Sequence, residues 1–80
     1  MEYYTYVIQS EVDGRFYKGQ TENIASRILQ HNSGKTKSTK GYLPWKLVYF
    51  EKFKTREEAL LREKYFKSGV GREFLKKLLK

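Results

Sequence analysis

The sequence contains no cysteine, so it has neither disulfide bonds nor thiolate metal sites. It has a single histidine, which excludes a zinc site built from several histidines. No apolar run reaches the length of a membrane span, and the first residues lack the basic start and apolar middle of a signal peptide. We therefore expect a soluble, cytoplasmic protein that is stabilised by packing alone.

Acidic residues are scarce. Nine Asp and Glu face 17 Lys and Arg, which gives a net charge of +8. Residues 23–50 contain no acidic residue, and residues 64–80 contain only Glu73. Such blocks attract a polyanion, so they favour a nucleic-acid or other phosphate partner. Ordinary solubilising charge is the alternative.

Eighty residues are enough for one domain, which we place at residues 1–80. Residues 3–9 and 15–19 are typical of two strands, joined by a turn at Asp13-Gly14. A four-residue loop in this hairpin pairs Ile8 with Tyr17 and brings Tyr6 diagonal to Tyr17 on the same face. Residues 45–53 predict a third strand, with Leu47, Tyr49 and Phe53 facing away from Val48 and Phe50.

Three helices are expected. The first runs to about Ser33 and carries Arg27 and His31 beside an apolar arc made by Ile24, Ala25, Ile28 and Leu29. The second begins at a capping box, Thr55 with Glu58, and runs to about Lys67. The third begins near residue 70, and its inner face is predicted to hold Val70, Phe74, Leu75, Leu78 and Leu79. The order is β-β-α-β-α-α, an α+β fold.

Glu63 lies in the middle of an apolar stripe of the second helix, between Ala59, Leu60 and Phe66. An unpaired carboxylate there would cost several kcal/mol or take up a proton. It therefore needs a partner: a basic side chain such as Arg27, several N–H groups, or a metal ion. Divalent metal binding is the functional alternative, because Mg²⁺ is often held by one or two carboxylates, water and a substrate phosphate.

The loop at residues 34–44 is longer than a passive connection needs. It interleaves Lys35, Lys37 and Lys40 with three hydroxyl residues that can donate to phosphate, Thr36, Ser38 and Thr39. Strand tyrosines such as Tyr6 and Tyr17 are commonly core aromatics, and a lone histidine is more often structural than catalytic. Taken singly, none of these residues indicates an enzyme.

Together they resemble the GIY-YIG nuclease family over nearly the full length. Tyr4-Thr5-Tyr6 is similar to the first family motif and Tyr17-Lys18-Gly19 to the second, followed at matching spacing by Arg27, His31 and Glu63. The likeness is greatest to small single-domain members, relatives of the incision subunit of bacterial excision repair. Tyr4 replaces the usual glycine of the first motif, and Lys18 replaces an aliphatic residue of the second. The asparagine that often follows the glutamate helix has no counterpart, since the last asparagine is Asn32.

The resemblance implies a three-stranded antiparallel sheet flanked by helices. It also implies phosphodiester hydrolysis with a single Mg²⁺ or Mn²⁺ held by Glu63. Tyr17 would activate the attacking water, helped by Tyr6 or His31, and Arg27 would stabilise the charge on the phosphate. The substrate would be DNA more than RNA, recognised by its structure, in DNA repair or recombination. The expected nucleic-acid contacts are Lys18, Lys35, Lys37, Lys40 and Lys46.

Two other functions fit the same charge pattern. The chain could keep the fold and bind nucleic acid without cleaving it. It could also be a basic domain that docks on an acidic protein, in which case DNA would not compete for the surface.

Overall fold

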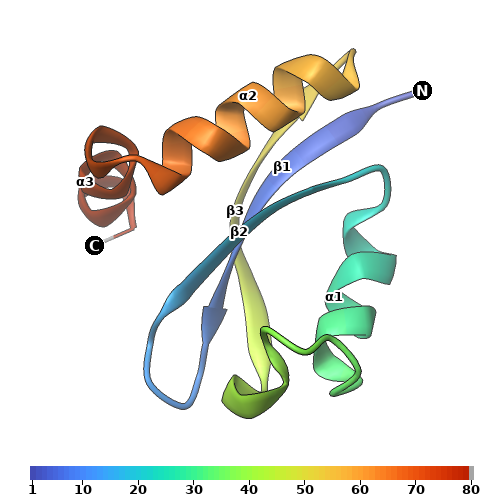
Figure 1. Cartoon of the computed structure of the whole chain (residues 1–80), viewed down its shortest axis with the longest axis vertical. Coiled ribbons are helices and arrows are strands. Elements are labelled where there is room, and N and C mark those ends of the chain that lie inside the picture. The colour runs from blue at the N-terminus through green and yellow to red at the C-terminus, as the bar shows by residue number, and fades with distance from the viewer. Residues whose placement is uncertain (80) are drawn as a thin grey trace.

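The computed structural model, which describes residues 1–79, has the predicted order β-β-α-β-α-α and an α+β fold (Figure 1). The three strands form one antiparallel sheet in the order β2-β1-β3, so β1 is central and β2 is an edge. The elements are β1 (Tyr3–Ser10), β2 (Phe16–Thr21), α1 (Ile24–Asn32), the 3₁₀ turn η1 (Lys40–Tyr42), β3 (Trp45–Phe53), α2 (Arg56–Lys67) and α3 (Gly69–Leu78).

The hairpin of β1 and β2 has the predicted register. Ile8 lies opposite Tyr17, and the amide of Ser10 donates to the carbonyl of Arg15 at 2.9 Å. Tyr6 then lies opposite Gly19, two residues further along β2. Because side chains alternate along a strand, Tyr6 and Tyr17 project from the same face of the sheet.

The two faces of the sheet carry separate cores. Alternation along β1 directs Tyr6 and Ile8 to one face, where they pack with Trp45 and with Ile28 of α1. Val7 points to the opposite face and packs with residues of α2 and α3. Figure 1 shows the same layering, with α1 on one side of the sheet and α2 and α3 on the other. We refer to these as the α1 face and the α2/α3 face.

The predicted alternation along β3 is wrong at its centre. The pairing with β1 shifts between Val7, which faces Tyr49, and Ile8, which faces Leu47. Val48 is the extra residue of this bulge, and both Val48 and Tyr49 pack on the α2/α3 face while Leu47 packs on the α1 face. A bulge inserts one residue into a strand and breaks the two-residue period.

The predicted apolar arc of α1 is also wrong in part. Leu29 is 73% exposed and Ala25 is exposed, whereas Ile28 is half-buried and His31 is fully buried. The helix begins after Asn23, whose side-chain oxygen accepts from the amide of Ser26 at 3.0 Å. The side of α1 that faces the sheet therefore includes polar residues.

The capping box of α2 is present, since Thr55 Oγ1 accepts from the amide of Glu58 at 3.2 Å. In α3, Leu75 is buried as predicted, but Val70 is 70% exposed and Leu78 is 47% exposed, so the inner face is narrower than expected. Within residues 1–79, no helix has the length and apolar character needed to cross a membrane.

Candidate active site

Four of the five predicted catalytic residues meet on the α1 face. Tyr6 comes from β1, Tyr17 from β2, and Arg27 and His31 from α1. The hydroxyl of Tyr6 lies 2.9 Å from Nε2 of His31, and Arg27 Nε donates to the same hydroxyl at 3.3 Å. The rings of Tyr17 and His31 pack edge to face, with centroids 4.9 Å apart. We call these four residues the tyrosine–histidine cluster.

The glycine of the second motif makes room for this cluster. A Cβ atom added to Gly19 would lie 2.5 Å from the hydroxyl oxygen of Tyr6 and 2.6 Å from its Cζ. The ring of Tyr6 therefore lies against the backbone of β2, where only glycine leaves enough space.

His31 is fully buried, and both of its ring nitrogens have partners. Nε2 faces Tyr6, and Nδ1 lies 3.0 Å from the hydroxyl of Thr39. That hydroxyl donates to the carbonyl of Thr36 at 3.4 Å, so its oxygen is left to accept from Nδ1–H. Nε2 then carries no proton and accepts from Tyr6, which itself accepts from Arg27.

Thr39 is the member of this network that the sequence did not reveal. The sequence predicted that its hydroxyl would donate to a phosphate, but the side chain of Thr39 is fully buried on the inner side of the loop. Its carbonyl accepts from Trp45 Nε1 at 2.9 Å, which fixes the backbone at this point. The loop at residues 34–44 thus covers His31 from the side opposite to Tyr6.

Burial and charge adjust the acidity of the cluster. Burial raises the pKa of Tyr6, and the hydrogen bond and positive charge of Arg27 oppose this rise. Burial also lowers the pKa of His31, with a further contribution from Arg27. The hydrogen bond to Tyr6 raises the pKa of Arg27, and Tyr17 contributes in the same direction. His31 is therefore neutral near pH 7 and can accept a proton.

The two tyrosines differ in access to solvent. Tyr6 is fully buried, whereas Tyr17 is half-buried at the edge strand. A substrate that approaches the cluster from solvent meets Tyr17 first, with Tyr6 and His31 behind it.

Within residues 1–79, Glu63 of α2 makes no hydrogen bond or ion pair with the four residues of the cluster. Its carboxylate pairs with Lys67 one turn along α2 at 2.7 Å, and not with Arg27 as one alternative suggested. α2 packs on the opposite face, against β1 and the edge strand β2. Its negative charge also raises the pKa of Tyr6, by less than burial does, so Glu63 lies within electrostatic range of the cluster.

The residues around Glu63 fit only a metal site in which most ligands are water or substrate oxygens. Within residues 1–79 no three His, Cys, Asp or Glu side chains come together to hold a metal. One carboxylate suits Mg²⁺ or Mn²⁺, which retain water and accept substrate phosphate oxygens as ligands. It does not suit a closed protein cage.

The predicted nucleic-acid lysines fall into two groups. Lys35, Lys37, Lys40 and Lys46 are all exposed on or beside the loop that covers His31. Lys18 projects from the opposite face of β2 to Tyr17, towards α2 and α3, so it belongs to a different surface.

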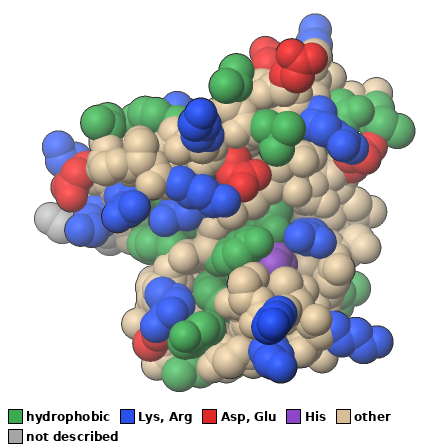
Figure 2. Space-filling model, viewed as in Figure 1, with side chains coloured by type: hydrophobic (Ala, Val, Ile, Leu, Met, Phe, Trp, Pro, Cys, Tyr) green, Lys and Arg blue, Asp and Glu red, His purple; other side chains and the backbone are tan. Residues whose placement is uncertain are grey.

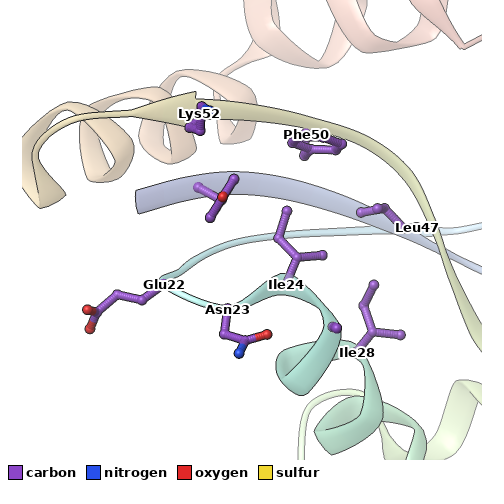
Figure 3. Close-up of a pocket in the computed structure, with 9 residues that line it drawn as sticks. Glu22, Asn23, Ile24, Ile28, Leu47, Phe50 and Lys52 are labelled. Carbon is purple, nitrogen blue, oxygen red and sulfur yellow. The ribbon is translucent and has the colours of Figure 1, made fainter. Parts of the chain in front are cut away.

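A wide groove lies away from the cluster. This groove has a volume of about 770 Å³ and lies between α1 and β3. Figure 3 shows residues that line it, among them Ile24, Ile28, Leu47 and Phe50. None of the five predicted catalytic residues lines it. In the tyrosine–histidine cluster, Tyr6 and His31 are fully buried, and Tyr17 and Arg27 are partly exposed. This partly exposed edge suits an extended substrate better than an enclosed one.

Comparison with known proteins agrees with this geometry. A family model described as the GIY-YIG catalytic domain matches residues 2–77. The chain therefore belongs to the GIY-YIG family, a family of nucleases.

Within that family the relatives are small proteins. A UPF0213 protein of Bacillus licheniformis is 47% identical over 66 residues, which cover 81% of this chain and 67% of that protein. A UPF0213 protein of Staphylococcus saprophyticus is 40% identical over 76 residues, covering 94% of this chain and 92% of that protein. The solution structure of a UPF0213 protein from Bacillus halodurans has a TM-score of 0.58 and 37% identity, and the match covers 98% of this chain and 85% of that one.

Proposed function

We propose that this protein is a metal-dependent endonuclease that hydrolyses phosphodiester bonds in nucleic acid. The observation that carries the proposal is the tyrosine–histidine cluster, in which a neutral histidine, two tyrosines and an arginine share one contact network. Membership of the GIY-YIG family supports the same class of reaction.

Each residue of the cluster has a distinct role in the proposal. Tyr17, the more exposed tyrosine, first loses its own proton to solvent and then, as the phenolate, takes the proton of the attacking water. A tyrosine with an ordinary pKa near 10 is a weak base at neutral pH, so it needs a nearby cation. Arg27 supplies that charge and stabilises the charge that develops on the phosphate. His31 accepts a hydrogen bond from Tyr6 through Nε2, which orients the Tyr6 hydroxyl at the inner end of the network.

Glu63 is the residue that would hold a divalent ion, Mg²⁺ or Mn²⁺. The chemistry that such an ion supplies when bound is polarisation of the phosphate and stabilisation of the leaving oxygen. In the structure, the carboxylate of Glu63 pairs with Lys67 at 2.7 Å.

The proposed substrate is DNA rather than RNA, chosen by its structure. A chain of this size has little surface for reading bases, so branched or flapped substrates suit it better than a sequence-specific site. The exposed lysines of the loop, Lys35, Lys37, Lys40 and Lys46, would contact phosphates. Work in the cytoplasm, in DNA repair or recombination, is part of the same proposal.

The proposal is tested by nicking of flapped and branched DNA with and without Mg²⁺. Glu63→Gln and Tyr17→Phe should each lower the cleavage rate by about 10²-fold or more, since general acid–base groups contribute about 10²–10⁴-fold. Glu57→Gln, on the exposed side of the same helix, and Tyr3→Phe are matched controls that should cleave normally. Unchanged cleavage in both test variants would show that the activity comes from elsewhere.

A second candidate is a module that binds nucleic acid without cleaving it. The ion pair of Glu63 with Lys67 favours it, as does the lack of an asparagine after Asn32. This candidate predicts tight DNA binding with no metal-dependent cleavage in the wild-type protein.

A further inference from the structure

Four basic residues gather on the α2/α3 face, away from the loop lysines. Lys18 comes from β2, Lys67 from the last turn of α2, and Arg72 and Lys76 from α3. We call them the α3 basic cluster. Figure 2 shows Lys and Arg side chains gathered over this part of the molecule, on the left of the view.

The side chains of this cluster are held in place. Lys18 is half-buried at a small hollow of about 110 Å³, which it shares with Phe16, Leu75, Arg72 and Lys76. Arg72 donates through Nε and a terminal nitrogen to the carbonyl of Lys67, at 3.3 and 3.2 Å. Packing at the hollow therefore holds Lys18, and hydrogen bonds to the last carbonyl of α2 hold Arg72.

Their charge is only partly balanced, because Lys67 alone has a close carboxylate partner, Glu63 at 2.7 Å. Within residues 1–79, no carboxylate lies within 4.0 Å of Lys18 or Arg72, and the pair of Lys76 with Glu73 is long, at 3.7 Å, and exposed. Burial lowers the pKa of Lys18, and the nearby charges of Arg72 and Lys67 lower it further. Like charges held together destabilise a protein unless an anion joins them.

The cluster is also continuous with the candidate active site. Lys67 joins the two, because its ammonium pairs with Glu63 at 2.7 Å while its carbonyl accepts from Arg72. A polymer of phosphates that reached Glu63 would continue along the same α2/α3 face onto these four cations. The hollow is far too small to enclose a nucleotide, so contact from outside, by a backbone, is the mode that fits.

We propose that the α3 basic cluster is a second phosphate-binding surface, which holds the sugar–phosphate backbone of nucleic acid beside the active site. This inference rests on the proposed function for its choice of nucleic acid over other polyanions. The surface positions the substrate and reads no bases, as backbone contacts generally do.

The test compares two double variants that remove the same charge from different places. Lys18→Met/Arg72→Gln removes two cations of the cluster. Lys52→Gln/Lys54→Gln removes two exposed cations at the far end of β3. Binding of a fluorescent flapped DNA is measured by anisotropy at several NaCl concentrations, in the absence of divalent ions so that no cleavage intervenes.

We expect the cluster variant to bind at least tenfold more weakly and to lose about two units of slope in log K against log salt, close to one per phosphate contact. The control variant should keep both its affinity and its slope within error. Equal losses in the two variants would overturn the inference, since net charge alone would then explain binding. Stronger competition by polyglutamate than by unlabelled DNA would also overturn it, in favour of an acidic protein.

Arg72→Gln removes hydrogen bonds to a helix end, so folding is checked by thermal melting. Lys18→Met/Lys76→Gln leaves those bonds in place and should give the same loss of slope. The binding result stands apart from the nuclease test: a wild-type protein that binds DNA through this surface without cleaving it would refute the nuclease and keep the surface.

Discussion

At the scale of single residues, the proton on His31 depends on one buried hydroxyl. The hydroxyl of Thr39 donates a hydrogen bond to the carbonyl of Thr36 and accepts one from His31 Nδ1–H. Nε2 of His31 then carries no proton and accepts a hydrogen bond from Tyr6. In the other tautomer, the proton would be on Nε2 instead of Nδ1. Nε2 and the Tyr6 hydroxyl would then both be donors, and Tyr6 could no longer donate to His31. Thr39 is thus a positioning residue for the proposed reaction.

Replacing Thr39 by valine keeps the shape of the side chain but removes this acceptor. We expect Thr39→Val to lower the free energy of unfolding by about 1–3 kcal/mol, the usual penalty for a buried polar group left without a partner. The ¹⁵N shifts of His31 should move away from the Nδ1–H tautomer, and cleavage should fall. Thr39→Ser keeps the hydroxyl and should restore all three. A valine variant with unchanged His31 shifts would contradict the proposed direction of the hydrogen bonds.

His31 should also make stability depend on pH. Because burial and Arg27 lower its pKa in the folded protein, the unfolded chain binds a proton on His31, near pH 6.5, before the folded protein does. The free energy of unfolding should therefore fall as pH falls below about 6.5 and level off below the folded pKa. Urea titrations at pH 7.5 and 5.5 measure the difference, which His31→Gln should reduce. An equal fall in both proteins would assign the effect to other groups.

At the scale of elements, the hairpin of β1 and β2 depends on one glycine. Gly19→Ala places a methyl group on the ring of Tyr6, and such overpacking typically costs about 1–3 kcal/mol. Gly41→Ala is a matched control, because a Cβ there meets no atom within 4 Å. As a single variant, Tyr6→Leu should lower the free energy of unfolding. In the double variant, the smaller leucine should leave room for the new methyl group, so the combined loss should be smaller than the sum of the two single losses. Strictly additive losses in urea unfolding would show that the two side chains do not compete for space.

The sequence predicted those elements whose local signals agree with their tertiary contacts. The hairpin register followed from its turn and from alternation, so the meeting of Tyr6 and Tyr17 on one face could be predicted. The bulge at Val48 could not, because it arises from pairing with β1 and leaves no mark on the local pattern. The orientation of α1 was misjudged because the period alone favoured Leu29 as a core residue, while the sheet takes up Ile28 and His31.

The candidate site was predictable to the same extent. Motif spacing identified the four residues that the structure brings together, yet spacing says nothing of the buried contact between His31 and Thr39. Glu63 was recognised as a carboxylate in need of a partner. Its partner is a basic side chain, one of the three kinds predicted, but it is Lys67 one turn away on the same helix, an ordinary i,i+4 pair, and not Arg27.

At the scale of the whole molecule, positive charge exceeds what ion pairs neutralise. The net charge is +8. Within residues 1–79, the ion pair of Arg62 with Glu51, at 2.7 Å, is the one in which both side chains are less than a third exposed. The remaining pairs each have a partner at least half exposed, and such pairs contribute little. Self-repulsion should therefore dominate the response of the protein to salt.

We expect the free energy of unfolding to rise when NaCl is increased from 10 to 200 mM, since the Debye length, over which the charges repel one another, falls from about 30 Å to about 7 Å. The gain should be of the order of 1 kcal/mol, the size of one close charge pair in water. Urea unfolding at the two salt concentrations measures it. The gain should shrink in Lys18→Met/Arg72→Gln more than in Lys52→Gln/Lys54→Gln, because the first pair removes charges that are held together. A fall in stability with salt would mean that the ion pairs outweigh the repulsion, and would remove one physical reason for an anion to bind at the α3 basic cluster.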